Sequence, residues 1–289
     1  MKTALALLFA VGVASAIVAC HRGTPDIQFA TYNEDYAGKP DFADVEHKYP
    51  LTPAQLMTLT PQNIKEFDQE KVDQIYARLT AGPIPDGAYD GDLFFPKGMS
   101  GHTRLAEIVG GVKGQVAGLE LAKLTILGRA LWKGKVFYRN ERVLRNRIDH
   151  LELLSEFFPK PGEEEKIRTL ATNGHTDQLY FPAKLYCGQS LLDSRRESVI
   201  IDYAFTDEID SYHEIPDKLA GREGLLVRDE IRMVRPGFYL GRAYLAESFG
   251  LNFTVYNDAA AKAGSADFEK TGKVAEDCFV GPQRMAAVQ

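Results

Sequence analysis

Apolar and polar residues alternate with a period of two over much of the chain between residues 83 and 257. The alternation is clearest at residues 198–205, where polar or small residues separate four larger apolar ones. Those four residues are Val199, Ile201, Tyr203 and Phe205. Successive side chains of a strand point to opposite faces of a sheet, so this pattern predicts a half-buried strand.

Further short strands are predicted through the same region, with turns between them. They cover residues 88–95, 135–148, 183–192, 230–234, 238–245 and 253–256. Pro236-Gly237 is a turn signal and predicts a hairpin. Many short strands with few helices are typical of a closed antiparallel barrel. We therefore predict a mainly β domain over 83–257 with flanking helices, arranged as an antiparallel barrel of the calycin or lipocalin type.

A different periodicity precedes the strands. Residues 62–80 place apolar side chains roughly on one helical face, and Thr52-Pro53 pairs a capping hydroxyl with a proline suited to the first helical turn. These signals predict a helical lead-in over 51–82. Residues 103–131 carry glycines at four-residue spacing, which predicts a helix packed closely on a sheet. The alanine-rich, polar residues 258–289 predict a partly ordered C-terminal tail.

The N-terminus has the pattern of an export signal. Lys2 precedes the uniformly apolar or small stretch Ala4–Ala19, which is short for a bilayer span of about 20 residues. Ile17-Val18-Ala19-Cys20 resembles the lipobox of bacterial lipoproteins. The resemblance implies cleavage of a signal peptide, residues 1–19, and acylation of Cys20. The alternative is an ordinary secretory signal cut after Ala16 or Ala19.

The resemblance to lipoproteins also implies a location. His21, rather than an aspartate, follows the cysteine, which favours the outer membrane in sorted lipoproteins. We therefore expect a protein of the bacterial cell envelope, held on the bilayer by acylated Cys20 and facing the periplasm. Residues 20–50 carry little periodicity and several Gly and Pro residues, so they are predicted to be a tether.

Composition narrows the classes of partner. Hydrophobic residues make up 45% and charged residues 26% of the chain, which is typical of a globular protein. The net charge of −6 gives no electrostatic help in binding nucleic acid, so no nucleic-acid partner is expected. Besides Cys20, only Cys187 and Cys278 are present, and they form either one disulfide or two free thiols. No zinc-type spacing occurs, so neither a metal nor a cofactor is predicted.

Two short motifs suggest a family. Gly87-Ala88-Tyr89-Asp90-Gly91 opens the first predicted strand, and Trp132-Lys133-Gly134-Lys135-Val136-Phe137 opens a later one. Their order resembles that of the GXWXG-domain proteins, whose first motif has a tryptophan where this chain has Tyr89. The resemblance covers roughly residues 85–256. It implies lipocalin-like β-structure and carries no particular activity over to these residues.

The predicted barrel has either a solid core or an apolar cavity, because an eight-stranded barrel holds packed side chains or one small ligand. The alternation does not separate these two cases. The inward-pointing candidates are Tyr89, Phe137, Val199, Ile201, Tyr203, Phe238 and Leu240.

Signals for catalysis are few. Gly98–His102 lacks the glycine spacing of a nucleophile elbow, and His150, His175 and His213 show no ligand spacing. The candidate acid–base residues are Asp202, Asp229 and Glu230. Asp202 is preferred because it lies inside an apolar strand, with Arg232 or Arg242 as a partner. The alternative is that Asp202 faces solvent on the polar side of its strand.

The sequence therefore leaves three functions open. The first is a membrane-anchored periplasmic lipoprotein that binds a lipid or other apolar small molecule in its barrel. The second is an envelope enzyme with an acid–base site in the barrel, using Asp202 and Arg232. The third is a scaffold without catalytic activity.

Overall fold

The computed structural model describes five segments of the chain, and every structural statement below concerns them. They are residues 25–31, 41–95, 131–149, 167–172 and 175–281. The predicted signal peptide with Cys20, and residues 103–130 of the glycine-rich helix, lie outside these segments. The same holds for His150 and for the segment Gly98–His102.

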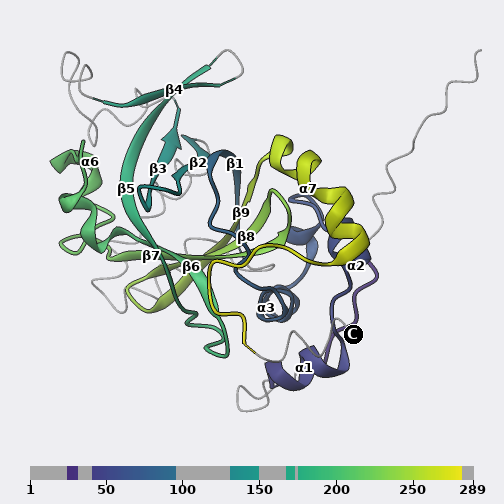
Figure 1. Ribbon diagram of the computed structural model, residues 1–289. Coiled ribbons are helices and arrows are strands. Elements are labelled where there is room, and N and C mark those ends of the chain that lie inside the picture. The colour runs from purple at the N-terminus through teal and green to yellow at the C-terminus, as the bar shows by residue number, and fades with distance from the viewer. Residues whose placement is uncertain (1–24, 32–40, 96–130, 150–166, 173–174, 282–289) are drawn as a thin grey trace, which may run out of the picture.

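Eight antiparallel strands close into a barrel (Figure 1). Each strand of the barrel pairs with its neighbours in chain order, and β9 pairs with β1 to complete the ring. The strands are β1 (Gly87–Phe94), β2 (Trp132–Tyr138), β3 (Val143–Ile148), β5 (His175–Gln189), β6 (Glu197–Asp202), β7 (Val227–Arg235), β8 (Phe238–Leu245) and β9 (Ser248–Tyr256). β4 (Thr169–Thr172) pairs with β5 outside the ring. The predicted fold class, mainly β with a closed antiparallel barrel, is confirmed.

The predicted hairpin is also confirmed, because β7 and β8 meet at Gly237, whose φ of 72° lies in the left-handed region. The strand predicted at 198–205 is shorter than expected. It ends at Asp202, whose carboxylate accepts a hydrogen bond from the Ala204 amide (2.9 Å) and caps the 3₁₀ helix η5 (Tyr203–Glu208). Local capping therefore ends the alternating pattern early.

The helical lead-in contains α2 (Pro53–Thr58) and α3 (Gln69–Arg78). Thr52 caps α2 through a full capping box, as the Thr-Pro signal predicted. The amphipathic helix predicted at 62–80 is shorter, because Asp68 caps α3 at its Lys71 amide (3.0 Å). A separate 3₁₀ turn, η2 (Ile64–Glu66), precedes it.

Two segments predicted to lack regular structure are helical. α1 (Phe42–Lys48) lies within the predicted tether and buries Val45 and Glu46. α7 (Asp258–Thr271) lies within the predicted tail, begins at its Asn257 cap and buries Phe268. Both helices are stabilised by packing on the rest of the molecule, which a count of local apolar residues does not reveal.

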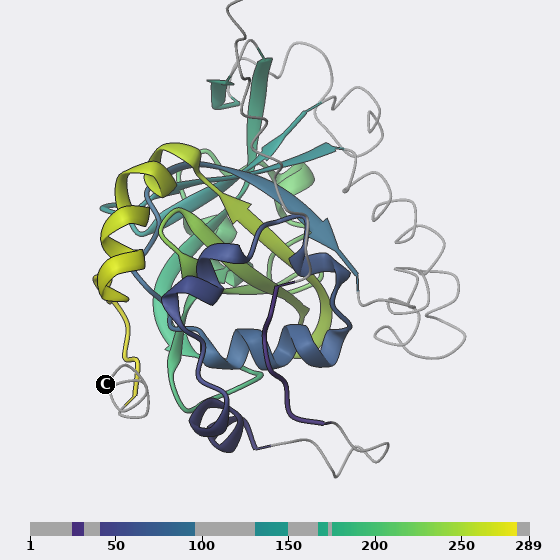
Figure 2. The same ribbon diagram turned by 90° about the vertical axis from the view of Figure 1, so that its right-hand side faces the viewer.

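Helices α1, α2, α3 and α7 gather on one side of the barrel (Figure 2). The short α6 (Glu214–Asp217) lies on the other side (Figure 1). Because four helices cover part of the barrel wall, several strands are buried on both faces; β8, for example, buries its first five residues in succession. This double burial determines where the polar residues of the strands are placed.

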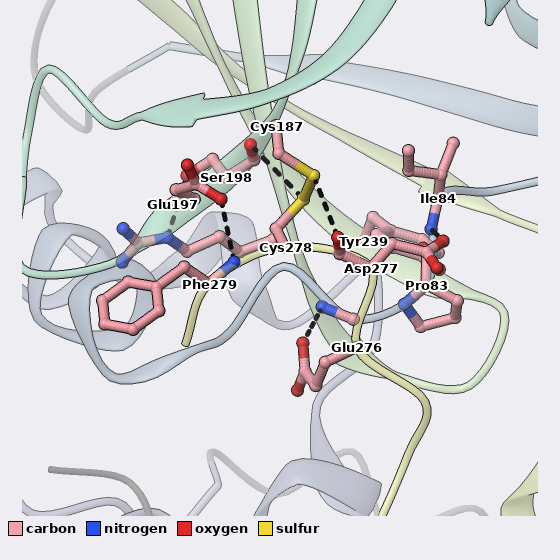
Figure 3. Close-up of a disulfide and its surroundings, with 12 residues drawn as sticks. Pro83, Ile84, Cys187, Glu197, Ser198, Tyr239, Glu276, Asp277, Cys278 and Phe279 are labelled. Carbon is pink, nitrogen blue, oxygen red and sulfur yellow. Dashed lines mark hydrogen bonds between the residues drawn. A yellow bond between two sulfur atoms is a disulfide. The ribbon is translucent and has the colours of Figure 1, made fainter. Parts of the chain in front are cut away.

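One end of the barrel is crossed by residues 80–86, which we call the strap. The strap begins at Thr80, paired with Met233 of β7, and ends where β1 starts, on the far side of β8 and β9. Inside the barrel, the Tyr239 hydroxyl donates to the Pro83 carbonyl (2.7 Å). The C-terminal segment braces the strap, since Asp277 accepts from the Ile84 amide (2.7 Å) (Figure 3).

The C-terminal segment is itself held by a disulfide. Cys278 is bonded to Cys187 of β5, so of the two alternatives for these cysteines the structure contains the bond (Figure 3). Glu197 lies beside it and accepts from the Phe279 amide (2.8 Å). The disulfide thus connects the barrel wall to the segment that braces the strap.

Candidate functional site inside the barrel

The strand register determines which side chains point into the barrel, because directly paired residues share a face. Ile231 of β7 pairs with Val199 and Gly241, and Gly241 pairs in turn with Phe253. Tyr89, Phe137, Val199 and Ile201 belong to this inner face, as predicted from the alternation.

The register corrects the prediction for two residues of β8. Tyr239 pairs with Met233 and Val255 and so lies on the inner face, which places Phe238 and Leu240 on the outer face. Both residues are fully buried there. Helices cover that side of the barrel, so β8 has apolar residues on both faces. The alternation of apolar and polar residues therefore does not show which face of β8 points inward.

Aromatic side chains fill the barrel at the strap end. The ring of Tyr89 packs edge-on against those of Phe137 (5.3 Å) and Tyr239 (5.9 Å). Ile84 of the strap is fully buried in the same hydrophobic core. These residues belong to one packed hydrophobic core at this end of the barrel.

Away from the strap the inner face carries four polar side chains in mutual contact, which we call the inner cluster: Lys135, Asn146, Tyr203 and Asp229. The ammonium of Lys135 lies 2.9 Å from a carboxylate oxygen of Asp229 and 2.7 Å from the Tyr203 hydroxyl. It also donates to the Asn146 side-chain oxygen (2.9 Å). The side chains of Lys135 and Asp229 are only 3% and 6% exposed.

Aromatic rings surround the ammonium. The nitrogen of Lys135 lies 5.2 Å from the Phe253 ring centre and 5.5 Å from that of Trp132, within the range of cation–π attraction. The indole N–H of Trp132 donates to Asn146 (2.9 Å). Both rings lie directly on glycines, Trp132 on Gly91 and Phe253 on Gly241, where any side chain would collide with them. The glycines therefore make room for aromatic rings above the inner cluster.

The residues of the inner cluster come from four elements, β2, β3, η5 and β7. Lys135 pairs with both Tyr89 and Asn146, so β1, β2 and β3 place it on the inner face. Asp229 comes from β7, and Tyr203 follows directly after β6. Tyr203 was predicted to lie in the barrel and Asp229 to be an acid–base candidate, but Lys135 and Asn146 were not predicted as site residues. The sequence did contain a signal for Lys135. It lies two residues before Phe137, which was predicted to point inward, so the two side chains share the inner face of the strand.

The protonation states in the inner cluster follow from burial and from the ion pair. Burial opposes the charge on Lys135, but the attraction of Asp229 outweighs it and raises the pKa of the ammonium. Burial raises the pKa of the Tyr203 hydroxyl to about 12. At neutral pH the cluster therefore holds an ammonium and a neutral phenol beside the Asp229 side chain. It can both donate hydrogen bonds to a bound polar group and accept them from it.

The structure does not bring together the predicted acid–base pair. Asp202 lies on the outer face at the end of β6 and accepts from the Tyr186 hydroxyl (2.6 Å). Arg232 is also on the outer face but is fully buried, where it donates to Ser198 (2.9 Å) and contacts Asp193 (3.4 Å). Arg242, the other partner considered, pairs with Asp73. Each arginine has a carboxylate partner other than Asp202.

The remaining candidates are placed as follows. The ring of His213 meets that of Tyr180 edge-on, and His213 lies 3.7 Å from the Asp217 carboxylate. His175 is exposed at the start of β5. In the five described segments, the one group of residues with metal-ligating atoms close together is Cys187, Glu197 and Cys278, whose sulfurs form the disulfide. In those segments, no helix has the length and apolar character needed to cross a bilayer.

Comparison of the chain with models of protein families, with curated proteins and with solved structures finds no match in any of the three.

Proposed function

We propose that the barrel binds a small, mainly apolar molecule that carries one polar group, and that the inner cluster contacts this group. The observation that carries the proposal is the ion pair between Lys135 and Asp229 on the inner wall of a closed barrel. Binding sites for small molecules combine apolar walls with a few convergent polar groups, which is the composition found here.

A purely structural role explains the inner cluster poorly. Burying an ion pair costs several kcal/mol per ion, and well-packed apolar residues in its place are often as stable or more stable. A barrel that only needed a core would lose little stability if apolar residues replaced Lys135 and Asp229. Buried charged groups with shifted pKa values are instead common where a protein binds or transforms another molecule.

We further propose that the chain is a bacterial lipoprotein. The support is the sequence Ile17-Val18-Ala19-Cys20 after an apolar stretch. Acylated Cys20 would hold the barrel on the periplasmic side of the outer membrane, beside a source of lipids and other apolar molecules. More specifically, we propose that the ligand of the barrel is a lipid. The resemblance to GXWXG-domain proteins remains a prediction.

The sole tryptophan of the chain makes ligand binding measurable. Trp132 contacts the inner cluster, so a bound fluorophore should quench its emission by energy transfer. We would titrate the Cys20→Ser protein with N-phenyl-1-naphthylamine, a neutral apolar probe with one N–H donor. The double variant Lys135→Met/Asp229→Leu keeps the interior neutral and filled. We expect it to bind the probe at least about tenfold more weakly, the loss of one charge-assisted hydrogen bond.

The matched control is Lys184→Met, which removes an ion pair with Glu208 on the barrel surface. This variant should bind the probe as the parent protein does. Equal affinity of the parent and the double variant would refute the role of the inner cluster. Native mass spectra that show only unliganded protein, together with no binding of the probe, would refute binding in the barrel altogether.

Acylation is tested separately in cells fed with a labelled palmitate analogue. The parent chain should incorporate the label and stay with the membranes. Cys20→Ser should lose the label and become soluble, whereas Cys187→Ser/Cys278→Ser should keep the label. Label in the Cys20→Ser protein would contradict the lipoprotein assignment.

A further inference from the structure

A groove lies outside the barrel, between β7 and the helices α1, α2 and α7. It is open to solvent, and its cavity volume is about 40 Å³. Apolar residues form most of its wall, with one cationic and one anionic side chain, Arg78 and Glu46. Leu51, Leu56, Leu79, Val234 and Phe268 are among the apolar wall residues.

Arg78 lines this groove and has one buried donor that no acceptor uses. Its residue is 6% exposed, and its Nε and Nη1 atoms donate to the backbone carbonyls of Gln74 (2.9 Å), Gln28 (3.1 Å) and Tyr49 (2.6 Å). Its Nη2 atom is buried and has no hydrogen-bond partner. A buried guanidinium nitrogen without an acceptor is costly, because it has lost water and gained nothing in return. Burial also lowers the pKa of Arg78 to about 10, against the attraction of Glu46.

The surrounding layer has more cations than anions. We call this the outer layer; it consists of Arg78, Arg195, Arg196, Arg232, Glu46 and Asp193. Glu46 is shared between Arg195 (3.0 Å) and Arg196, and Asp193 is shared between Arg195 (2.7 Å) and Arg232 (3.4 Å). Two carboxylates thus pair with three guanidinium groups, while the fourth, that of Arg78, donates to backbone carbonyls instead. Arg196 has a buried Nε atom without a partner as well.

We propose that the groove is a second binding site, which takes a small organic carboxylate with a hydrocarbon body. On binding, the Arg78 side chain would turn its buried Nη2 toward the groove. The carboxylate would accept a hydrogen bond from it and would supply negative charge to the outer layer. The hydrocarbon body would pack on Leu56, Val234 and Phe268 of the wall. Guanidinium and carboxylate groups match in geometry and form strong, charge-assisted hydrogen bonds.

Two features favour a carboxylate over a phosphate. The wall is mainly apolar, so a ligand that brings hydrocarbon gains from burial, at about 25 cal/mol for each Å² removed from water. Glu46 also lines the groove, and its negative charge would repel a dianion more strongly than a monoanion. The site is separate from the barrel interior, and the inference does not depend on the function proposed for the inner cluster.

The test is calorimetric titration of the Cys20→Ser protein with octanoate, and with octan-1-ol as the uncharged ligand of the same chain length. Octanoate should bind at least about tenfold more tightly than octan-1-ol, and Arg78→Met should remove that preference. Because Arg78 also binds three carbonyls, a second variant is needed. Leu51→Trp should fill the groove without touching Arg78 and should abolish binding of both ligands.

The control for the second variant is Leu191→Trp, a surface position that is 43% exposed and does not line the groove. It should leave both affinities unchanged. The Lys135→Met/Asp229→Leu variant should also bind octanoate normally, whether or not the barrel has a ligand of its own. Binding that survives Leu51→Trp, binding lost in the barrel variant, or no binding of octanoate at all would each overturn the proposal.

Discussion

The two faces of the barrel wall use buried charge in different ways, and β7 contributes to both. On the inner face, Asp229 pairs with Lys135, and no fully buried side-chain nitrogen or oxygen of the inner cluster lacks a hydrogen-bond partner. On the outer face, Arg232 belongs to a layer in which three guanidinium groups share two carboxylates. The fourth guanidinium group of the layer, that of Arg78, donates to backbone carbonyls. Two nitrogens of that layer, on Arg78 and Arg196, have no partner.

The difference shows that burial alone does not identify a binding site. The inner cluster is balanced in charge and satisfied in hydrogen bonds, so a ligand there must exchange contacts that already exist. The outer layer is short of negative charge and of acceptors, so an anion there adds contacts that are missing. We therefore expect the two regions to respond differently when one charged group is removed.

The largest effect is expected for Glu46→Ala in the outer layer. This change leaves Arg195 and Arg196 without a shared acceptor in a layer that already has too few. The free energy of unfolding, from urea titration, should fall by about 3–5 kcal/mol. Glu269→Ala, on the exposed side of α7, is the control and should change it by less than about 0.5 kcal/mol. A small loss for Glu46→Ala would mean that the outer layer tolerates unpaired cations.

A somewhat smaller effect is expected for Lys135→Met in the inner cluster, because it leaves a single carboxylate unpaired. The free energy of unfolding should fall by about 3 kcal/mol. Adding Asp229→Leu should recover most of this loss, since the pair is then replaced by apolar side chains. If the double variant is as unstable as the single one, the ion pair has a structural role that apolar packing does not replace. That result would contradict the assignment of the inner ion pair to ligand binding.

The third-largest effect is expected at alkaline pH, which should destabilise the folded protein through the inner cluster. The pKa of Tyr203 is raised from 10.0 to about 12 in the folded protein, so above pH 10 the unfolded chain releases a proton that the folded one retains. Stability from this group is present below pH 10 and is lost between pH 10 and 12. The raised pKa of Lys135 acts in the same direction.

The loss attributable to Tyr203 is about 2–3 kcal/mol over that range, the equivalent of a two-unit shift. It is measured as the difference in the pH dependence of unfolding between the parent protein and Tyr203→Phe. The variant should lose less stability over this range, although Tyr89 and other buried tyrosines still contribute. Identical pH profiles for the two proteins would show that the Tyr203 hydroxyl is not held neutral by its surroundings.

The smallest effect is expected for Asp202→Asn. Asp202 lies in neither the inner cluster nor the outer layer, and asparagine can still accept from the Ala204 amide that it caps. The free energy of unfolding should fall by no more than about 1 kcal/mol. Ligand binding to the barrel and to the groove should not change. Loss of a ligand in this variant would restore Asp202 as a site residue and would show that a third region matters.

Residues of the candidate site were only partly predictable from the sequence. Tyr89, Phe137, Val199 and Ile201 were placed correctly on the inner face, since period-two alternation is preserved around them. Lys135 was missed because a charged residue in a strand is normally assigned to the face that points to solvent. The pair of Asp202 and Arg232 was predicted from neighbouring strands, and the structure gives Arg232 other partners.

By itself the sequence determined the class of the fold, the β7–β8 hairpin and the cap of α2. These depend on local signals: alternation, a Pro-Gly turn, and a threonine before a proline. The tertiary structure alone decided which face of β8 points inward, that 258–271 is a helix, and that Lys135 meets Asp229. Helices cover the outer wall, so strands such as β8 are apolar on both faces, and only packing tells one face from the other.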